Sequence, residues 1–183
     1  MKCLSRAATA LLFPCLVSLF ISPITALAKY DPAKNYQEIP AIVKQFPVPN
    51  VDMGTPALVK DKTDFTSQKE METFIDELSK KSPSLQVRII GQSRQGRDFP
   101  LLVFSDAHSP APAVLLKNTK PTVLIMALQH GNEPASGEAA LAYAKSLADG
   151  KEGNVLSRVN VLIIPRANPD GAENFTRDLA NGI

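Results

Sequence analysis

A histidine and a glutamate stand three positions apart in residues 129–134, which read QHGNEP. They follow an apolar run, residues 122–128 (TVLIMAL), and precede an alanine-rich segment. If the run is a strand and the segment a helix, His130 and Glu133 can face one point at the turn between them. Zinc binds imidazole nitrogen and carboxylate oxygen, and a catalytic site uses three protein ligands plus a water. The pattern therefore predicts a metal site at the end of a strand.

The spacing alone leaves a simpler interpretation open. A His-x-x-Glu pair is common on surfaces, and Glu133 near a helix start is favoured by the helix dipole without any metal. The context favours the metal, because Gly131 permits a sharp turn and Pro134 suits the first position of a helix. The sequence is compatible with both interpretations.

The segments around this pair predict the elements that position it. A helix is expected over 67–81, where Met71, Phe74, Ile75 and Leu78 have helical spacing, with Thr66 or Ser67 as its cap. The other expected elements are strands at 85–90 and 97–105 joined by a hairpin loop, a strand at 122–128 buried on both faces, a helix at 138–147, a strand at 159–164 and a turn at 168–171. Two strands joined by one helix favour parallel pairing. The predicted class is α/β, with a mixed, mainly parallel sheet flanked by helices.

Ligands of open α/β sheets bind outside the carboxyl ends of the strands. Arg166, Asn168, Asp170 and Arg177 follow the strand expected at 159–164. These residues can therefore share a crevice with the His130 loop. Arg166 is expected to be structural, and Asn168 and Asp170 to form the turn.

The first 28 residues match a secretory signal peptide. Lys2 and Arg6 precede an apolar stretch, and Ala26-Leu27-Ala28 fits a cleavage site. An uncleaved anchor is the alternative, but Pro14 and Pro23 interrupt the apolar run. We expect cleavage, a periplasmic or secreted protein, and no stable membrane anchor afterwards. Residues 29–64 contain five prolines and are expected to form a loop-rich arm before a domain over 65–183.

Charge and cysteine content exclude some classes of function. Cleavage would remove two basic residues and no acidic ones, leaving 18 of each sign from the 20 basic and 18 acidic residues of the chain. Such a balance gives no basic stripe, so no nucleic-acid partner is expected. Both cysteines, Cys3 and Cys15, lie in the expected signal. The remaining chain has no thiol for a disulfide.

Four motifs, in order, resemble the zinc carboxypeptidase family. Residues 130–136 (HGNEPAS) resemble its first zinc-ligand motif and residues 90–97 (IGQSRQGR) its hairpin motif. Residues 165–171 (PRANPDG) resemble its NPDG turn. Residues 175–183 (FTRDLANGI) resemble the segment before its Asn-Arg pair. The resemblance covers about residues 65–183.

The resemblance implies a carboxypeptidase-like fold, a Zn²⁺ cofactor and a peptide substrate. It makes His130 and Glu133 zinc ligands. Arg177 would be the catalytic and substrate-binding arginine, a cation aimed where negative charge develops on the scissile carbonyl. A solvated loop arginine is the alternative for that residue. The family's second zinc histidine, its Asn-Arg pair and its general-base glutamate have no counterpart among residues 1–183; His108, the other histidine, is expected in a surface loop.

The sequence is compatible with three alternative functions. The first is a periplasmic or secreted zinc carboxypeptidase that cleaves a C-terminal peptide bond, represented by its amino-terminal part and inactive as this chain. The second is a related N-acyl amino acid deacylase. The third is a non-catalytic remnant that binds peptides or proteins. Side-chain preference and oligomeric state are left open by the sequence. So is the question of whether the chain is a fragment or a truncated product.

Overall fold

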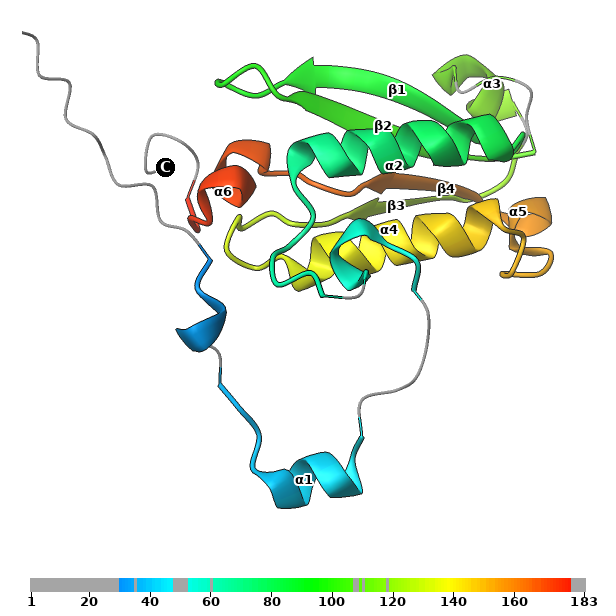
Figure 1. Cartoon of the computed structure of the whole chain (residues 1–183). Coiled ribbons are helices and arrows are strands. Elements are labelled where there is room, and N and C mark those ends of the chain that lie inside the picture. The colour runs from blue at the N-terminus through cyan, green and yellow to red at the C-terminus, as the bar shows by residue number, and fades with distance from the viewer. Residues whose placement is uncertain are drawn as a thin grey trace, which may run out of the picture.

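A computed structural model describes residues 30–34, 36–47, 53–59, 61–106, 109, 111–117 and 119–178. Within these ranges the chain forms one four-stranded sheet, with helices α2 and α4 packed side by side on one of its faces (Figure 1). The expected signal peptide and His108 lie outside the described residues. None of the helices within the described ranges is long and apolar enough to span a bilayer.

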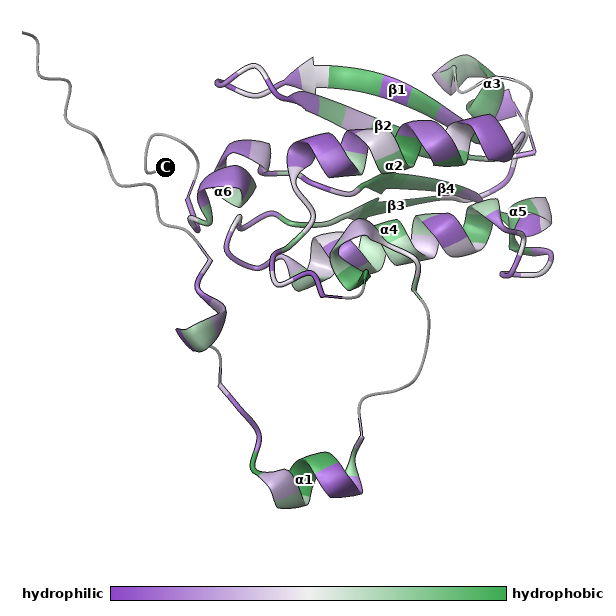
Figure 2. Cartoon of the chain, in the orientation of Figure 1, coloured by the Kyte–Doolittle hydropathy of each residue, from purple (hydrophilic) through white to green (hydrophobic). Residues whose placement is uncertain are grey.

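Helix α2 spans Gln68–Lys81 and confirms the helix predicted for that segment. Ser67 caps it through a capping box, since its hydroxyl accepts from the Glu70 N–H while the Glu70 carboxylate accepts from the Ser67 N–H. Met71, Ile75 and Leu78 form its buried stripe. Figure 2 shows the alternation of polar and apolar positions that this stripe creates along α2. The cap fixes where α2 begins, close to the predicted site.

The sheet has the order β1-β2-β4-β3. Strands β1 (Leu85–Gln92) and β2 (Asp98–Phe104) form the predicted antiparallel hairpin, and β2 also pairs antiparallel with β4 (Asn160–Ile164). Strand β3 (Thr122–Met126) pairs parallel with β4, from Thr122 opposite Asn160 to Met126 opposite Ile164. The mixed α/β class is confirmed. Among the described strands, however, the parallel share is smaller than predicted, because β3 and β4 are the one parallel pair.

Helix α4 (Ala135–Ala148) joins β3 to β4 and completes this unit. Its buried side packs into one core together with α2, β2 and β4, and contributes Ala140, Leu141, Ala144 and Leu147 to it. The prediction that the strand at 122–128 is buried on both faces is wrong for its first five residues. Strand β3 lies at the edge of the described sheet, and Val123, Leu124 and Met126 are exposed.

The remaining elements are short. Helix α3 (Pro112–Lys117) lies in the connection between β2 and β3, and α5 (Val155–Arg158) precedes β4. The predicted turn at 168–171 is instead the start of helix α6 (Pro169–Asn174). The described parts of the arm contain two 3₁₀ turns, Pro32–Lys34 and Pro56–Leu58, and helix α1 (Pro40–Gln45). Helix α1 buries no residue and lies apart from the layers (Figure 1).

Candidate metal centre and its support

The loop that carries His130 leaves β3 through a bend at Leu128. Pairing with β4 continues past the strand, because the Ala127 N–H donates to the Ile164 carbonyl at 2.9 Å. Leu128 then adopts a left-handed conformation, with φ of 51°, which is uncommon for a residue with a Cβ. Its N–H donates to the Ser136 hydroxyl at 2.9 Å, so the first turn of α4 holds the bend in place.

His130, Glu133 and Arg177 come together as predicted. His130 Nδ1 lies 3.0 Å from Glu133 Oε2, and an Arg177 terminal nitrogen donates to Glu133 Oε1 at 2.6 Å. All three side chains are partly exposed. The hydrogen bond with His130, followed by that from Arg177, holds the pKa of Glu133 below its usual value. Glu133 is therefore an ionised carboxylate that bridges an imidazole and a guanidinium.

Gly131 is required by the close packing of this loop against α6. A Cβ built at Gly131 would lie 2.0 Å from the Gly171 carbonyl carbon and 2.4 Å from the Ala172 nitrogen. Both contacts are with backbone, which cannot rotate away. The loop that carries His130 and Glu133 therefore rests directly on the first turn of α6.

Asn168 ties α6 to the backbone of the predicted catalytic arginine. Its side-chain oxygen accepts from the Gly171 N–H at 2.9 Å and caps the helix. Its side-chain nitrogen donates to the carbonyls of Arg177 at 3.3 Å and of Asp178 at 3.4 Å. The backbone N–H of Asn168 donates to the Leu128 carbonyl at 3.0 Å. Through its backbone and its side chain, the buried residue Asn168 thus links the bend before His130, the start of α6 and the segment that carries Arg177.

Asp170 connects α6 to the hairpin motif far away in the sequence. Its buried carboxylate accepts from the Ser93 hydroxyl at 2.7 Å, from an Arg97 guanidinium nitrogen at 2.6 Å and from the Gln95 N–H at 3.2 Å. Burial opposes its ionisation, but these hydrogen bonds outweigh burial, and the pKa of Asp170 lies below its usual value. Asp170 is thus an anchor for the hairpin, a function that the turn prediction for this residue did not include.

Arg166 has the structural role that was expected, though not only at the turn. Its guanidinium donates to Glu173 Oε1 at 2.7 Å and to the Thr66 carbonyl. Burial lowers the pKa of this arginine, and the Glu173 carboxylate opposes that effect. Because Glu173 also accepts from the Gln68 N–H at 2.6 Å, the network joins the start of α2 to α6.

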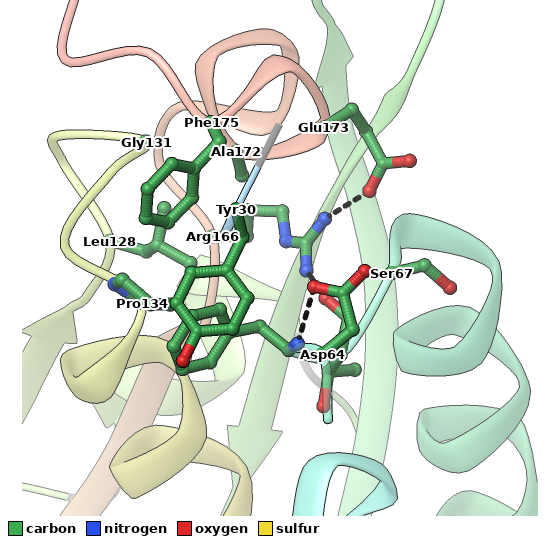
Figure 3. A pocket seen from close by; sticks show the side chains of 12 residues that line it. Tyr30, Asp64, Ser67, Leu128, Gly131, Pro134, Arg166, Ala172, Glu173 and Phe175 are labelled. Atoms are coloured by element: carbon green, nitrogen blue, oxygen red, sulfur yellow. Dashed lines mark hydrogen bonds and ion pairs between the residues drawn. The ribbon is translucent and has the colours of Figure 1, made fainter. Parts of the chain in front are cut away.

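Residues 129–134, which carry the two predicted ligands, are called the metal loop below. A pocket of about 290 Å³ lies beside this loop, and Arg166 and Glu173 lie at its wall (Figure 3). Gly131 and Pro134 line it from the loop, while Tyr30 and Phe175 contribute aromatic rings. The pocket is thus bounded by the arm, α6 and the loop that carries the predicted ligands.

The residues present suit part of a zinc site. An imidazole nitrogen and a carboxylate oxygen 3.0 Å apart can bind one cation between or beside them. Within the described ranges, however, no group of three or more histidine, cysteine, aspartate or glutamate side chains is arranged to hold a metal. His130 and Glu133 therefore fit as two ligands of a set whose third member is not among the described residues. Their assignment as ligands, and that of Arg177 as the catalytic arginine, remains a prediction.

The comparisons with known proteins agree on one family. Residues 71–180 match the family model for zinc carboxypeptidases. The chain is 33% identical over 116 residues to carboxypeptidase E of Caenorhabditis elegans and 31% identical over 124 residues to carboxypeptidase 2 of Trichophyton rubrum. These matches cover 60% and 64% of this chain but only 24% and 22% of the relatives. The matched part thus spans about a quarter of the length of these curated relatives.

Solved structures share the fold. The carboxypeptidase A of Helicoverpa armigera is 26% identical with a TM-score of 0.54, and the match covers 63% of this chain and 29% of that chain. Bovine thrombin-activatable fibrinolysis inhibitor, solved with a tick carboxypeptidase inhibitor, is 20% identical with a TM-score of 0.52, covering 63% of this chain and 37% of that chain. The family model matches more than half of the chain, inside the range of about 65–183 over which the sequence resembles this family. The chain therefore belongs to the zinc carboxypeptidase family.

Proposed function

We propose that this chain carries the amino-terminal part of the active site of a zinc metallopeptidase that hydrolyses C-terminal peptide bonds. The observation that carries the proposal is the convergence of His130, Glu133 and Arg177 in a chain of this family, with His130 Nδ1 and Glu133 Oε2 3.0 Å apart. The relatives named above are carboxypeptidases, which favours this activity over the N-acyl amino acid deacylase considered from the sequence.

Each residue has a stated role in this proposal. His130 and Glu133 would hold Zn²⁺, which when bound polarises a carbonyl and lowers the pKa of a coordinated water. Arg177 would place a positive charge beside the scissile carbonyl oxygen, where negative charge develops during the reaction. Its link to Glu133 at 2.6 Å keeps that charge close to the metal ligands.

We further propose that residues 1–183 alone do not hydrolyse peptides, because the second zinc histidine and the general-base glutamate that the resemblance calls for have no counterpart among them. The test is to load the 183-residue chain with Zn²⁺ and to incubate it with a blocked dipeptide that has a free C-terminal carboxylate. The expected result is no release of the last residue. A rate that a chelator removes, and that His130→Ala abolishes, would contradict the proposed inactivity.

Export is part of the same proposal. The signal-like composition of residues 1–28 supports a periplasmic or secreted location. Expression of the chain in a bacterial host, followed by fractionation and N-terminal sequencing, tests it. A product that begins at Lys29 in the periplasm is expected, whereas an intact Met1 terminus in the membrane fraction would favour the anchor.

A further inference from the structure

Three aromatic rings from three separate segments meet beside the metal loop. Tyr30 belongs to the arm. Phe65 lies two residues before Ser67, the N-cap of α2, and Phe175 is the C-cap of α6. The ring centroid of Tyr30 lies 4.5 Å from that of Phe65, in a tilted arrangement, and 5.3 Å from that of Phe175, in an edge-on arrangement. Such geometry is typical of favourable aromatic pairs. Figure 3 shows Tyr30 and Phe175 at the pocket that Gly131 and Pro134 also line.

Phe175 has an unusual backbone conformation. It is the C-cap of α6, with φ of 50° and ψ of 44°, in the left-handed region that residues with a Cβ disfavour. Its N–H and that of Thr176 bond back to the last turn of the helix, with Thr176 donating to the Gly171 carbonyl at 2.8 Å. This conformation sets the direction in which the chain leaves α6, two residues before Arg177.

A disfavoured backbone conformation persists only where its surroundings hold it. The rings of Tyr30 and Phe65 lie against the Phe175 side chain from outside α6, with the Phe65 ring stacked at a centroid distance of 6.1 Å. Phe65 is part of the folded body, since its segment is tied to α2 and α4 through Thr66, Ser67 and Glu138. Tyr30 is the ring supplied by the arm.

We propose that Tyr30 is a positioning residue for Arg177. Its ring closes the aromatic cluster over Phe175 and holds the left-handed end of α6, which directs Arg177 toward Glu133. The role of Arg177 in catalysis rests on the function proposed above, but the positioning itself does not require metal or turnover. The start of the arm is thus part of the support of the site.

Trypsin provides a direct measure, because Arg177 is a cleavage site whose side chain is 55% exposed and whose backbone is held by the end of α6. The experiment treats the native 183-residue chain with trypsin and follows cleavage after Arg177 by mass spectrometry. Cleavage after Lys151, in the loop that follows α4, is the internal reference. We expect Tyr30→Ala to raise the rate after Arg177 about tenfold, the size expected when aromatic contacts of this kind are lost, with no change after Lys151.

Three controls define the mechanism. Tyr30→Phe keeps the ring, so its cleavage rate after Arg177 should lie closer to that of the wild type than to that of Tyr30→Ala. Tyr36→Ala removes the same side chain from an exposed position of the same arm, where 79% of Tyr36 is accessible, and should have no effect. In a Phe175→Leu background, Tyr30→Ala should add less than twofold, since it acts through that ring.

The proposal is overturned if Tyr30→Ala leaves cleavage after Arg177 within twofold of the wild type. It is equally overturned if cleavage after Lys151 rises in parallel, because the effect would then be general unfolding. Since the readout involves neither zinc nor peptide substrate, its failure leaves the proposed function untouched. Failure of the proposed function would appear instead in metal binding by His130 and Glu133.

Discussion

The contact between Gly131 and Gly171 offers the sharpest test of how the metal loop is supported. In Gly131→Ala the new Cβ would lie 2.0 Å from one backbone atom and 2.3 Å from another, whereas carbon atoms in contact need about 3.5–4.0 Å. The loop and α6 must therefore separate by about 1.5 Å. Overpacking of this kind costs about 1–3 kcal/mol, and the upper end applies here because both sides of the contact are backbone.

The expected consequences are measurable in two ways. Thermal unfolding should show a Tm lower by roughly 6–12 °C, from about 2–4 °C per kcal/mol for a chain of this size. Because His130 and Glu133 lie on the displaced loop, zinc affinity should fall about 10–100-fold, as it does when the support of a metal ligand is lost.

Gly91→Ala is the matched control. Its Cβ would have Phe99 as the nearest contact, at 3.9 Å, which is an ordinary distance. We expect a change in Tm of less than about 2 °C and unchanged zinc binding. If Gly131→Ala were as harmless as this control in both measurements, the close packing of the loop on α6 would be wrong.

Three further predictions concern the supports of α6 and α2. Asn168→Ala removes the helix cap and the hydrogen bonds to the Arg177 and Asp178 carbonyls, and should lower the free energy of unfolding, measured by urea titration, by about 1–2 kcal/mol. Asn168→Asp should recover part of this loss, because its carboxylate can still accept the capping hydrogen bond. Asp170→Asn weakens the charged hydrogen bonds from Arg97 and Ser93 and should cost about 2–3 kcal/mol in the same assay; a loss below 0.5 kcal/mol, or about that of a neutral surface change, would refute the anchor. Burial opposes ionisation of Glu70, but hydrogen bonds from Lys62 and Ser67 outweigh it and lower the pKa to about 2. A lowered folded-state pKa stabilises the fold above the unfolded value, so this contribution should be complete above about pH 4.5 and lost as the pH falls toward 2, and Tm against pH should be flatter in Glu70→Gln.

Local patterns predicted the parts of the fold that depend on local chemistry. The helix cap, expected at Thr66 or Ser67, and the apolar stripe of α2 lie close together in the sequence. The helix begins and ends within one residue of the prediction. The hairpin and the β3–α4–β4 unit also follow from short-range periodicity. Burial of β3 could not be predicted in this way, because it depends on which strands lie beyond it, and an apolar run reads the same at an edge as in a centre.

The supports of the site depend on contacts between distant segments. Ser93 and Asp170 are 77 residues apart, and neither carries a signal that names the other. The order of the four motifs could have suggested that the hairpin and NPDG motifs meet, but not that Asp170 would accept from Ser93, Gln95 and Arg97. The contact of Gly131 with Gly171 is similarly invisible, because a glycine in a turn motif is equally explained by backbone freedom.

The most direct test is to follow Zn²⁺ binding through the NMR signals of the two histidines. In NMR spectra of the 183-residue chain, His108 and His130 give the only imidazole signals. Titration with Zn²⁺ should perturb the His130 signals and spare those of His108, Glu133→Gln should weaken the effect at least tenfold, and His108→Ala should leave it unchanged. Zinc that perturbs His108 instead, or that still binds His130 with undiminished affinity in Glu133→Gln, would contradict the claim that His130 and Glu133 together hold the metal.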